Sequence, residues 1–267
     1  MLDNVIQVQE DLHSNSQRKE KGTLIKLDMK NAFDRVKLSF LYQVLRSFGF
    51  SADFVSLACI DRPWIAPLVN GRPSEFFQAS RGLRQGCPLS PFLYILMAEY
   101  LSRKLLAELA VGSLLGIKIA SGVNPFNHAL FANDSLLLGG ASLTIARAFN
   151  GILLNFYLSS GALINKNKSV VYGWNVDQRS FLRITHSLGF PGFSEWENIT
   201  YLGLPLTLGP NPSSLWLEVI CKLKAKIVSW GGQWLTKAGK LILIKVVLLS
   251  LPLFYFSLFL APKYIST

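Results

Sequence analysis

The sequence predicts an α+β fold, because short apolar segments of strand length lie among longer segments with helical spacing. Residues 23–28 have the pattern of a buried central strand, and strand segments at 127–131 and 135–138 are joined by a short turn. In contrast, apolar residues recur at helical spacing through 38–48. With 267 residues, half of them hydrophobic, the chain can bury a substantial core.

Turn and capping residues set the boundaries of the expected elements. Gly49 ends the helix that begins near Leu38, and Pro88 and Pro91 open a long helix. The dipeptide at 70–71, Asn-Gly, favours a tight hairpin turn. We expect helices at 7–21, 38–48, 52–60, 88–109 and 143–156. We expect strands at 23–28, 65–69, 75–78, 127–131, 135–138 and 168–172.

The charge balance indicates a polyanionic partner. The chain has 27 basic and 16 acidic residues, which gives a formal net charge of +11. Such a surplus is typical of proteins that bind nucleic acid or an anionic membrane surface. Residues 209–267 contain seven lysines and one acidic residue, so this segment could grip a nucleic-acid backbone. A solvated lysine face on an ordinary helical subdomain explains these lysines almost as well.

Two features bear on location. Residues 241–260 are almost wholly apolar and long enough to span a bilayer. A span directly after Lys237 and Lys240 would fit poorly with the rest of the chain, so we expect no membrane span. The three cysteines lack the spacing of a zinc site, and no secretory signal is visible at the N-terminus. We therefore expect an intracellular protein, with nucleus and cytoplasm left open.

Acidic residues at strand ends suggest a site for divalent cations. Asp28 ends the strand at 23–28, and Asp134 lies at the turn between 127–131 and 135–138. If these strands are neighbours, the carboxylates converge as hard oxygen ligands. Two such ions can activate a hydroxyl for attack on a phosphate and stabilise the leaving group. A lone Asp at a strand end is more often a turn residue, so the prediction depends on the whole set.

The segment 81–91 is the most distinctive in the chain. It reads Arg-Gly-Leu-Arg-Gln-Gly-Cys-Pro-Leu-Ser-Pro. Its glycines let the backbone approach a ligand closely, and Arg84 and Gln85 offer planar hydrogen-bond donors. A helix that begins at 88–91 would direct its positive end toward phosphate.

Together, the segments 26–34, 81–91 and 131–134 resemble motifs A, B and C of the reverse transcriptases of plant LINE-type (non-LTR) retrotransposons. The resemblance implies a polymerase palm, in which an antiparallel sheet packs on helices, and a mainly helical thumb-like region, with the fingers largely missing. It implies a helical lead-in at 1–22, a palm at 23–205 and a basic thumb-like region at 206–267. The apolar run at 241–260 then becomes a buried thumb helix with a proline break.

The resemblance also implies roles for individual residues. Asp28 would bind both of two Mg²⁺ or Mn²⁺ ions, and Asp134 would be a second ligand. Phe33 would be the aromatic gate that excludes a ribose 2′-hydroxyl, while Asp34 would be structural. Lys168 would act as a general acid toward pyrophosphate, although a lysine on a solvated turn is nearly as good an interpretation. The residues expected to contact the template and the incoming nucleotide are Arg81, Gly82, Arg84, Gln85 and Gly86.

Asn133 departs from the family pattern. The family has Phe-Ala-Asp-Asp where residues 131–134 read Phe-Ala-Asn-Asp. Asn keeps the shape of Asp but lacks its charge, and its amide nitrogen can only donate. A unit charge at 4 Å is worth roughly 4 kcal/mol at an effective dielectric constant of about 20. We therefore expect polymerisation to be severely impaired.

The resemblance implies RNA-directed DNA polymerisation, with an RNA template, a DNA primer and deoxynucleoside triphosphates as partners. One alternative is a non-catalytic remnant that still binds nucleic acid. Another is a translated relic with no selected role. The oligomeric state stays open.

Overall fold

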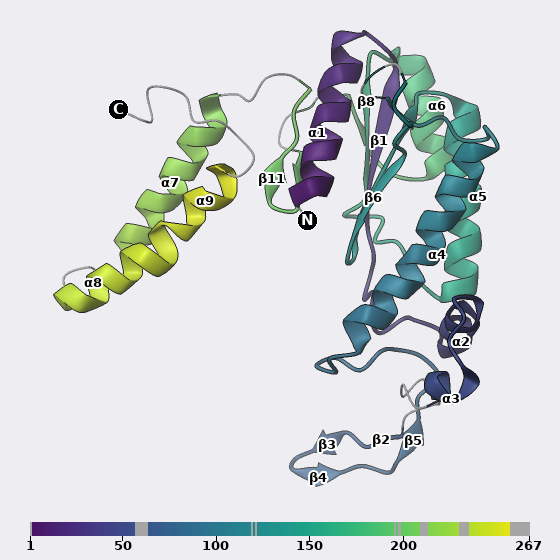
Figure 1. Ribbon diagram of the computed structural model, residues 1–267, viewed down its shortest axis with the longest axis vertical. Coiled ribbons are helices and arrows are strands. Elements are labelled where there is room, and N and C mark those ends of the chain that lie inside the picture. Colours follow the sequence, from purple (N-terminus) through teal and green to yellow (C-terminus); the bar gives the residue numbers. More distant parts are fainter. Residues whose placement is uncertain are drawn as a thin grey trace. The chain divides into compact units, whose positions relative to one another are not determined.

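The computed structural model describes residues 2–56, 64–118, 120, 122–194, 196, 199–208, 213–229 and 235–256. The chain forms two compact units. One comprises Arg18–Glu195, and the other joins Met1–Gln17 to Trp196–Thr267. Figure 1 labels most of the helices and strands of both. The palm expected at 23–205 and the thumb-like region expected at 206–267 remain predictions.

A five-stranded sheet forms the centre of the unit Arg18–Glu195. Its order is β6-β7-β1-β8-β9. The strands are β1 (Gly22–Asp28), β6 (His128–Phe131), β7 (Asp134–Gly140), β8 (Val170–Trp174) and β9 (Gly192–Phe193). Neighbouring strands are antiparallel except β8 and β9, which are parallel. The expected α+β fold with an antiparallel sheet is therefore confirmed, with one parallel edge strand added.

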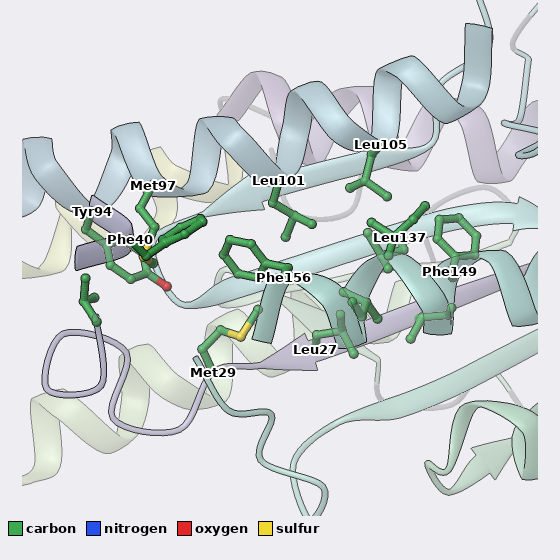
Figure 2. Close-up of a cluster of buried hydrophobic side chains, with 14 of the residues drawn as sticks. Leu27, Met29, Phe40, Tyr94, Met97, Leu101, Leu105, Leu137, Phe149 and Phe156 are labelled. Carbon is green, nitrogen blue, oxygen red and sulfur yellow. The ribbon is translucent and has the colours of Figure 1, made fainter. Parts of the chain in front are cut away.

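Helices cover one face of this sheet and enclose the main core with it. They are α2 (Leu38–Ser47), α4 (Ser90–Ala110), α5 (Leu143–Ser160) and α6 (Gln178–Leu188). Figure 2 shows Leu105 of α4 with Phe149 and Phe156 of α5, gathered around Leu27 and Leu137 of the sheet. Full burial of each such side chain contributes about 1.5–3 kcal/mol, so this core anchors the sheet.

Local signals explain where the helices end. Ser142 caps α5 by accepting a hydrogen bond from the Ile145 amide at 3.2 Å, and Asp177 caps α6 by accepting one from the Ser180 amide at 2.9 Å. Gly189 ends α6 with a φ of +74°, a left-handed conformation that suits glycine. Four of the expected helices agree with the structure in position. The structure also contains α6, which the sequence had not led us to expect.

A small hairpin extends between α3 (Ala52–Val55) and α4 (Figure 1). Its strands are β2 (Trp64–Ile65), β3 (Leu68–Val69), β4 (Arg72–Pro73) and β5 (Phe77–Gln78), paired as β2 with β5 and β3 with β4. Asn70 and Gly71 have φ values of +51° and +76°, as a tight turn requires. The turn is confirmed, with shorter strands than expected. Part of the helix expected at 52–60 lies outside the described residues.

The second unit is mainly helical. It contains α1 (Leu2–Gln17), β10 (Thr200–Tyr201), β11 (Leu204–Pro205), α7 (Ser213–Ser229), α8 (Lys237–Leu243), the π-helical segment η2 (Ile244–Leu248) and α9 (Ser250–Phe256). Gln9 ties α1 to the segment after β11, because its Nε2 donates to the Thr207 carbonyl oxygen at 2.7 Å and its Oε1 accepts from the Thr207 amide at 3.1 Å. The helix expected at 7–21 therefore starts earlier and ends at Gln17.

The C-terminal apolar run is largely exposed where the structure describes it. Neither α8 nor η2 has a buried side chain, and Leu249 and Leu253 are 51% and 63% exposed. Tyr255 is buried. The expectation of a buried helix is therefore wrong for most of these residues, although α9 packs on α7. Within the described chain, no helix combines the length and apolarity that crossing a bilayer needs.

Candidate functional site

Asp28 and Asp134 lie directly opposite each other on neighbouring strands. Asp28 is the last residue of β1, Asp134 is the first of β7, and the strand register pairs the two. Side chains alternate between the faces of a sheet. Because Leu27 faces the helical core, both carboxylates lie on the opposite face. The structure therefore brings the two expected ligands together at one end of the sheet.

Asn133 lies beside this pair at the tip of the β6–β7 hairpin. Ala132 makes the turn with a φ of +51°. The side-chain nitrogen Nδ2 of Asn133 donates to Oδ1 of Asp28 at 3.4 Å. The backbone carbonyl oxygen of Asn133 accepts from the Met29 amide at 3.1 Å. An aspartate here would place a third carboxylate beside Asp28. The amide instead donates to a carboxylate oxygen that a metal ion could otherwise use.

A loop between α5 and β8 holds the backbone of Asp28. The Asp28 amide donates to Oγ of Ser169 at 3.1 Å, and the Asn165 amide donates to the Asp28 carbonyl oxygen at 2.9 Å. Lys168 precedes Ser169, and its amide donates to the Asn165 carbonyl oxygen at 3.1 Å. The loop thus places Lys168 near the carboxylates. Ser169 and Asn165 were not among the site residues expected from the sequence, and the available signal was their position close to Lys168.

Two lysines contribute positive charge around the carboxylates. Lys26 lies two residues before Asp28 and therefore on the same face of β1. Burial raises the pKa of Asp134 above its usual value, and the charge of Asp28 raises it further, while Lys26 and Lys168 act in the opposite direction. Two ammonium groups thus accompany two carboxylates, so the local formal charge is close to zero. Lys26 was also not among the expected site residues, although its spacing from Asp28 was visible in the sequence.

The loop after β1 is joined to the 81–86 loop. Nε2 of Gln85 donates to Oδ1 of Asp34 at 2.9 Å, and the Gly82 amide donates to the Val36 carbonyl oxygen at 2.9 Å. Gly82 has a φ of +92°, and a Cβ there would lie 3.2 Å from the Asp34 carbonyl oxygen. Asp34, the residue expected to be structural, thus fixes the side chain of Gln85. The side-chain nitrogen of Gln85 already donates to Asp34.

Phe33 lies in the same loop and is half-buried. Its ring stacks on Tyr94 of α4 with 5.0 Å between the ring centroids. The Leu83 amide donates to the Phe33 carbonyl oxygen at 2.9 Å. The same environment buries the Tyr94 hydroxyl and raises its pKa to about 12. Phe33 therefore has a fixed orientation, as the proposed gate would need.

The remaining members of the 81–86 loop are less constrained. Arg81, Arg84 and Gly86 are exposed. Neither arginine makes a hydrogen bond or ion pair with Asp28 or Asp134 in the described part of the chain. The structure thus forms two groups of expected site residues. Asp28, Asn133, Asp134 and Lys168 form the first, and Phe33, Gly82 and Gln85 form the second.

The donor set suits a hard cation but is poor in charge. Two carboxylates and one amide oxygen are the kinds of ligand that Mg²⁺ and Mn²⁺ take. Among the residues that the structure describes, no cluster of three or more His, Cys, Asp or Glu side chains occurs. The residues therefore fit a divalent ion through Asp28 and Asp134, with Asn133 supplying no charge.

A sheet that places paired carboxylates at its strand ends, with helices on the other face, matches the polymerase palm that the resemblance implies. The model of the family "Reverse transcriptase (RNA-dependent DNA polymerase)" matches residues 2–206. The chain therefore belongs to the reverse transcriptase family, and it is a reverse transcriptase domain of the non-LTR retrotransposon type.

Similar proteins include retrotransposon polyproteins. The chain is 26% identical over 190 residues to the Pol polyprotein of the R2DM element of Drosophila melanogaster. The aligned residues cover 68% of the chain and 17% of the polyprotein. The chain is 24% identical over 205 residues to the Pol polyprotein of an R2 element of Popillia japonica, covering 72% and 28%. An uncharacterised mitochondrial protein of Arabidopsis thaliana is 44% identical over 68 residues, covering 26% and 56%. The chain thus spans 17% to 56% of the length of these relatives.

Among solved structures, two yeast telomerases are similar. A telomerase of Candida tropicalis truncated from its C-terminal domain aligns with a TM-score of 0.47 and 18% identity, over 66% of this chain and 35% of that one. A telomerase of Candida albicans, in complex with a fragment of telomeric RNA, aligns with a TM-score of 0.48 and 17% identity, over 66% and 30%.

Proposed function

We propose that this domain is an RNA-directed DNA polymerase domain whose chemistry is impaired by Asn133. The observation that carries the proposal is the in-register pair of Asp28 and Asp134, with the Asn133 amide donating to Asp28. Membership of the reverse transcriptase family supports the reaction class. The partners are an RNA template, a DNA primer and deoxynucleoside triphosphates, inside the cell.

Asp28 and Asp134 hold the divalent cations, Mg²⁺ or Mn²⁺, on which the reaction depends. When bound, such ions lower the pKa of the attacking 3′-hydroxyl and stabilise the charge of the leaving pyrophosphate. Lys168 lies close enough to influence Asp134 and is suited to donate a proton to the pyrophosphate. Phe33, fixed by Tyr94, borders the sugar of the incoming nucleotide.

The 81–86 loop positions the template and the incoming nucleotide. Gly82 and Gly86 both adopt positive φ angles, which shape a turn that leaves little side-chain bulk. Arg81 and Arg84 are exposed and offer guanidinium groups to phosphate or base. Gln85 acts through its bond to Asp34, which fixes the 81–86 loop against the loop that follows β1.

Asn133 weakens the reaction by reducing the affinity for cations. Without a third carboxylate, Lys26 and Lys168 already balance the charges of Asp28 and Asp134. One charge at 4 Å is worth roughly 4 kcal/mol at a dielectric constant of about 20, before desolvation is counted. A loss of even half this value lowers cation occupancy more than tenfold at a limiting concentration, since about 1.4 kcal/mol is a factor of ten.

Primer extension on an RNA template tests this proposal. The parent, Asn133→Asp, and Asn133→Asp combined with Asp28→Asn should be compared with Mg²⁺ and with Mn²⁺. We expect Asn133→Asp to extend at least about tenfold faster than the parent, and the double variant to lose the gain. Equal rates for the parent and Asn133→Asp would show that Asn133 is not limiting. Extension by the double variant at the Asn133→Asp rate would exclude Asp28 as a ligand.

The second candidate function is a non-catalytic domain that binds nucleic acid. The net charge of +11 and the neutral Asn133 favour it. Binding of a primer-template duplex should then weaken steeply as salt rises, and it should persist without divalent ions. Absent or salt-independent binding would exclude this candidate.

A further inference from the structure

A basic cavity lies on the outer surface of α5 and α6, separate from the carboxylates. Arg147 of α5 and Arg183 of α6 are both exposed. Phe149 and Ile184, on the inner sides of the same helices, belong to the core between these helices and the sheet. Asp28 lies on the opposite face of that sheet. The cavity is therefore separated from the candidate metal site by the sheet and the helical layer.

The walls of this cavity combine positive charge with apolar surface. Arg147, Arg183 and His186 line it together with Leu143 and Leu182, and its volume is about 400 Å³. No acidic side chain is among its described lining residues. Within the described chain, neither arginine takes part in an ion pair. The two guanidinium groups are therefore available to an anion.

The two helices are held side by side where the cavity forms. Nδ2 of Asn150 on α5 donates to the Ser187 carbonyl oxygen on α6 at 3.0 Å. Leu143 is the first residue of α5, an 18-residue helix whose amino end adds partial positive charge to the cavity. The arginines thus extend from a rigid pair of helices, which reduces the entropy lost when they bind a ligand.

An apolar hollow adjoins the basic cavity across α6. It has a volume of about 720 Å³ and shares Leu182 and His186 with the cavity. Leu182 supplies exposed apolar surface to it, whereas Phe181 and Phe190 form a wall that is almost fully buried. Phosphate pairs with arginine, and an unstacked base packs on aromatic or apolar side chains. The alternation of a cationic and an apolar compartment therefore matches the alternation of phosphate and base along a single strand.

We propose that this surface, the α5–α6 groove, binds a single-stranded RNA segment. Arg147 and Arg183 contact its phosphates, and one unstacked base packs on Leu182 in the hollow. The inference rests on the proposed function only in its choice of RNA as the partner. It adds a contact on the far side of the sheet from the polymerisation chemistry, through which a strand is retained without occupying the site of Asp28 and Asp134.

Fluorescence anisotropy with a 12-nucleotide RNA tests the groove directly, in EDTA and without nucleotides, over a series of salt concentrations. The variant is Arg147→Gln with Arg183→Gln. The matched control is Arg103→Gln with Lys104→Gln, which removes the same two charges where ion pairs with Glu99 and Glu108 already balance them. We expect the groove variant to bind more weakly than the control, with a salt slope smaller by about 1.4 for two lost phosphate contacts.

A second measurement needs no variant. Addition of the RNA to the parent domain should shift the imidazole resonances of His186, which lines both compartments, more than those of His13 and His128. Equal affinity and salt slope for the groove and control variants would overturn the proposal. A His186 shift produced by anionic lipid vesicles but not by RNA would overturn it too. Because no metal or nucleotide is present, failure here leaves the polymerase proposal standing, and absent polymerisation leaves this result valid.

Discussion

Asn133 donates a hydrogen bond from Nδ2 to Oδ1 of Asp28 over 3.4 Å, at the position where the resemblance places a metal-binding carboxylate. The bond joins the tip of the β6–β7 hairpin to the end of β1 across a pair of strands whose register already aligns Asp28 with Asp134. Asn133 thus lies beside a pair of carboxylates that the strand register holds together. It changes the charge that the site offers to a cation.

Lys26→Met should increase the affinity of the domain for Mn²⁺. Lys26 is half-buried on the same face as Asp28, and its charge opposes a cation held by Asp28 and Asp134. We expect an increase of about three- to tenfold, measured by titration calorimetry, because charge repulsion in a partly buried site is worth about 1 kcal/mol or more. Lys118→Met is the control, because Lys118 is exposed and lies far from the carboxylates. It is close in sequence to Leu115, whose carbonyl oxygen accepts from the amide of Gly140 at the other end of β7. An equal effect of both variants would refute a local role for Lys26.

Gly82→Ala should destabilise the domain more than Gly86→Ala. Both glycines have positive φ angles, +92° and +83°, and any L-residue there costs about 1–2 kcal/mol. At Gly82 the new Cβ would also lie 3.2 Å from the Asp34 carbonyl oxygen, whereas nothing lies within 4 Å at Gly86. Urea unfolding measures the two free energies. Equal losses would mean that the joined loops do not constrain Gly82.

Asp11 should make the domain less stable as pH rises from about 4 to 7. Asp11 is fully buried in α1, and burial raises its pKa from 3.8 to about 7. Gln7 lowers this pKa and Glu10 raises it, each by less than burial does. The folded state therefore keeps a proton that the unfolded state releases in this range. The resulting loss in the free energy of unfolding, up to about 4 kcal/mol, is complete above pH 7.

Asp11→Asn is the test, followed by thermal unfolding at several pH values. The variant should gain stability over the parent at pH 8 and gain little at pH 4. Glu10→Gln is a neighbouring control on the same helix. A parallel pH dependence for the parent and Asp11→Asn would contradict the raised pKa.

His128 should remain neutral until well below pH 6. Burial lowers its pKa to about 4, although the charge of Glu99 acts in the opposite direction. The ring nitrogens lie 2.6 Å from Oδ1 of Asn127 and 2.8 Å from Oγ of Ser102, which fits a proton on Nδ1 because the Asn127 oxygen can only accept. As pH falls, the His128 ring takes up a proton in the unfolded state before it does so in the folded state. The stability that the neutral, buried His128 gives to the folded state is therefore lost between about pH 6.5 and 4. A resonance midpoint near 6.5 in an NMR titration would refute this assignment.

The sequence predicts the parts of the site that depend on local pattern. A buried strand ending at Asp28, a hairpin tip at 132–134 and a helix beginning near Pro91 follow from periodicity and turn chemistry, and the structure contains all three, with Asp134 already the first residue of β7. The helix α6 was missed, although Asp177 and Gly189 frame it as capping residues. Its short amphipathic pattern was the available signal.

Other features depend on residues that are distant in sequence. The bond between Asn133 and Asp28 joins positions 105 residues apart, and the contact of Ser169 with the Asp28 amide joins positions 141 apart. Neither follows from local spacing. The exposure of Leu249 was also unforeseen, because apolar composition does not reveal what covers a helix.

The affinity for Mn²⁺, measured by calorimetry on the parent and on Asn133→Asp without nucleic acid, tests most directly whether Asn133 weakens the metal site. Asn133→Ser is the control for the loss of the hydrogen bond to Asp28, because it removes the donor amide without adding a charge. We predict that Asn133→Asp binds Mn²⁺ at least about tenfold more tightly than the parent, while Asn133→Ser stays within about threefold of it. Equal affinities for the parent and Asn133→Asp would contradict the account.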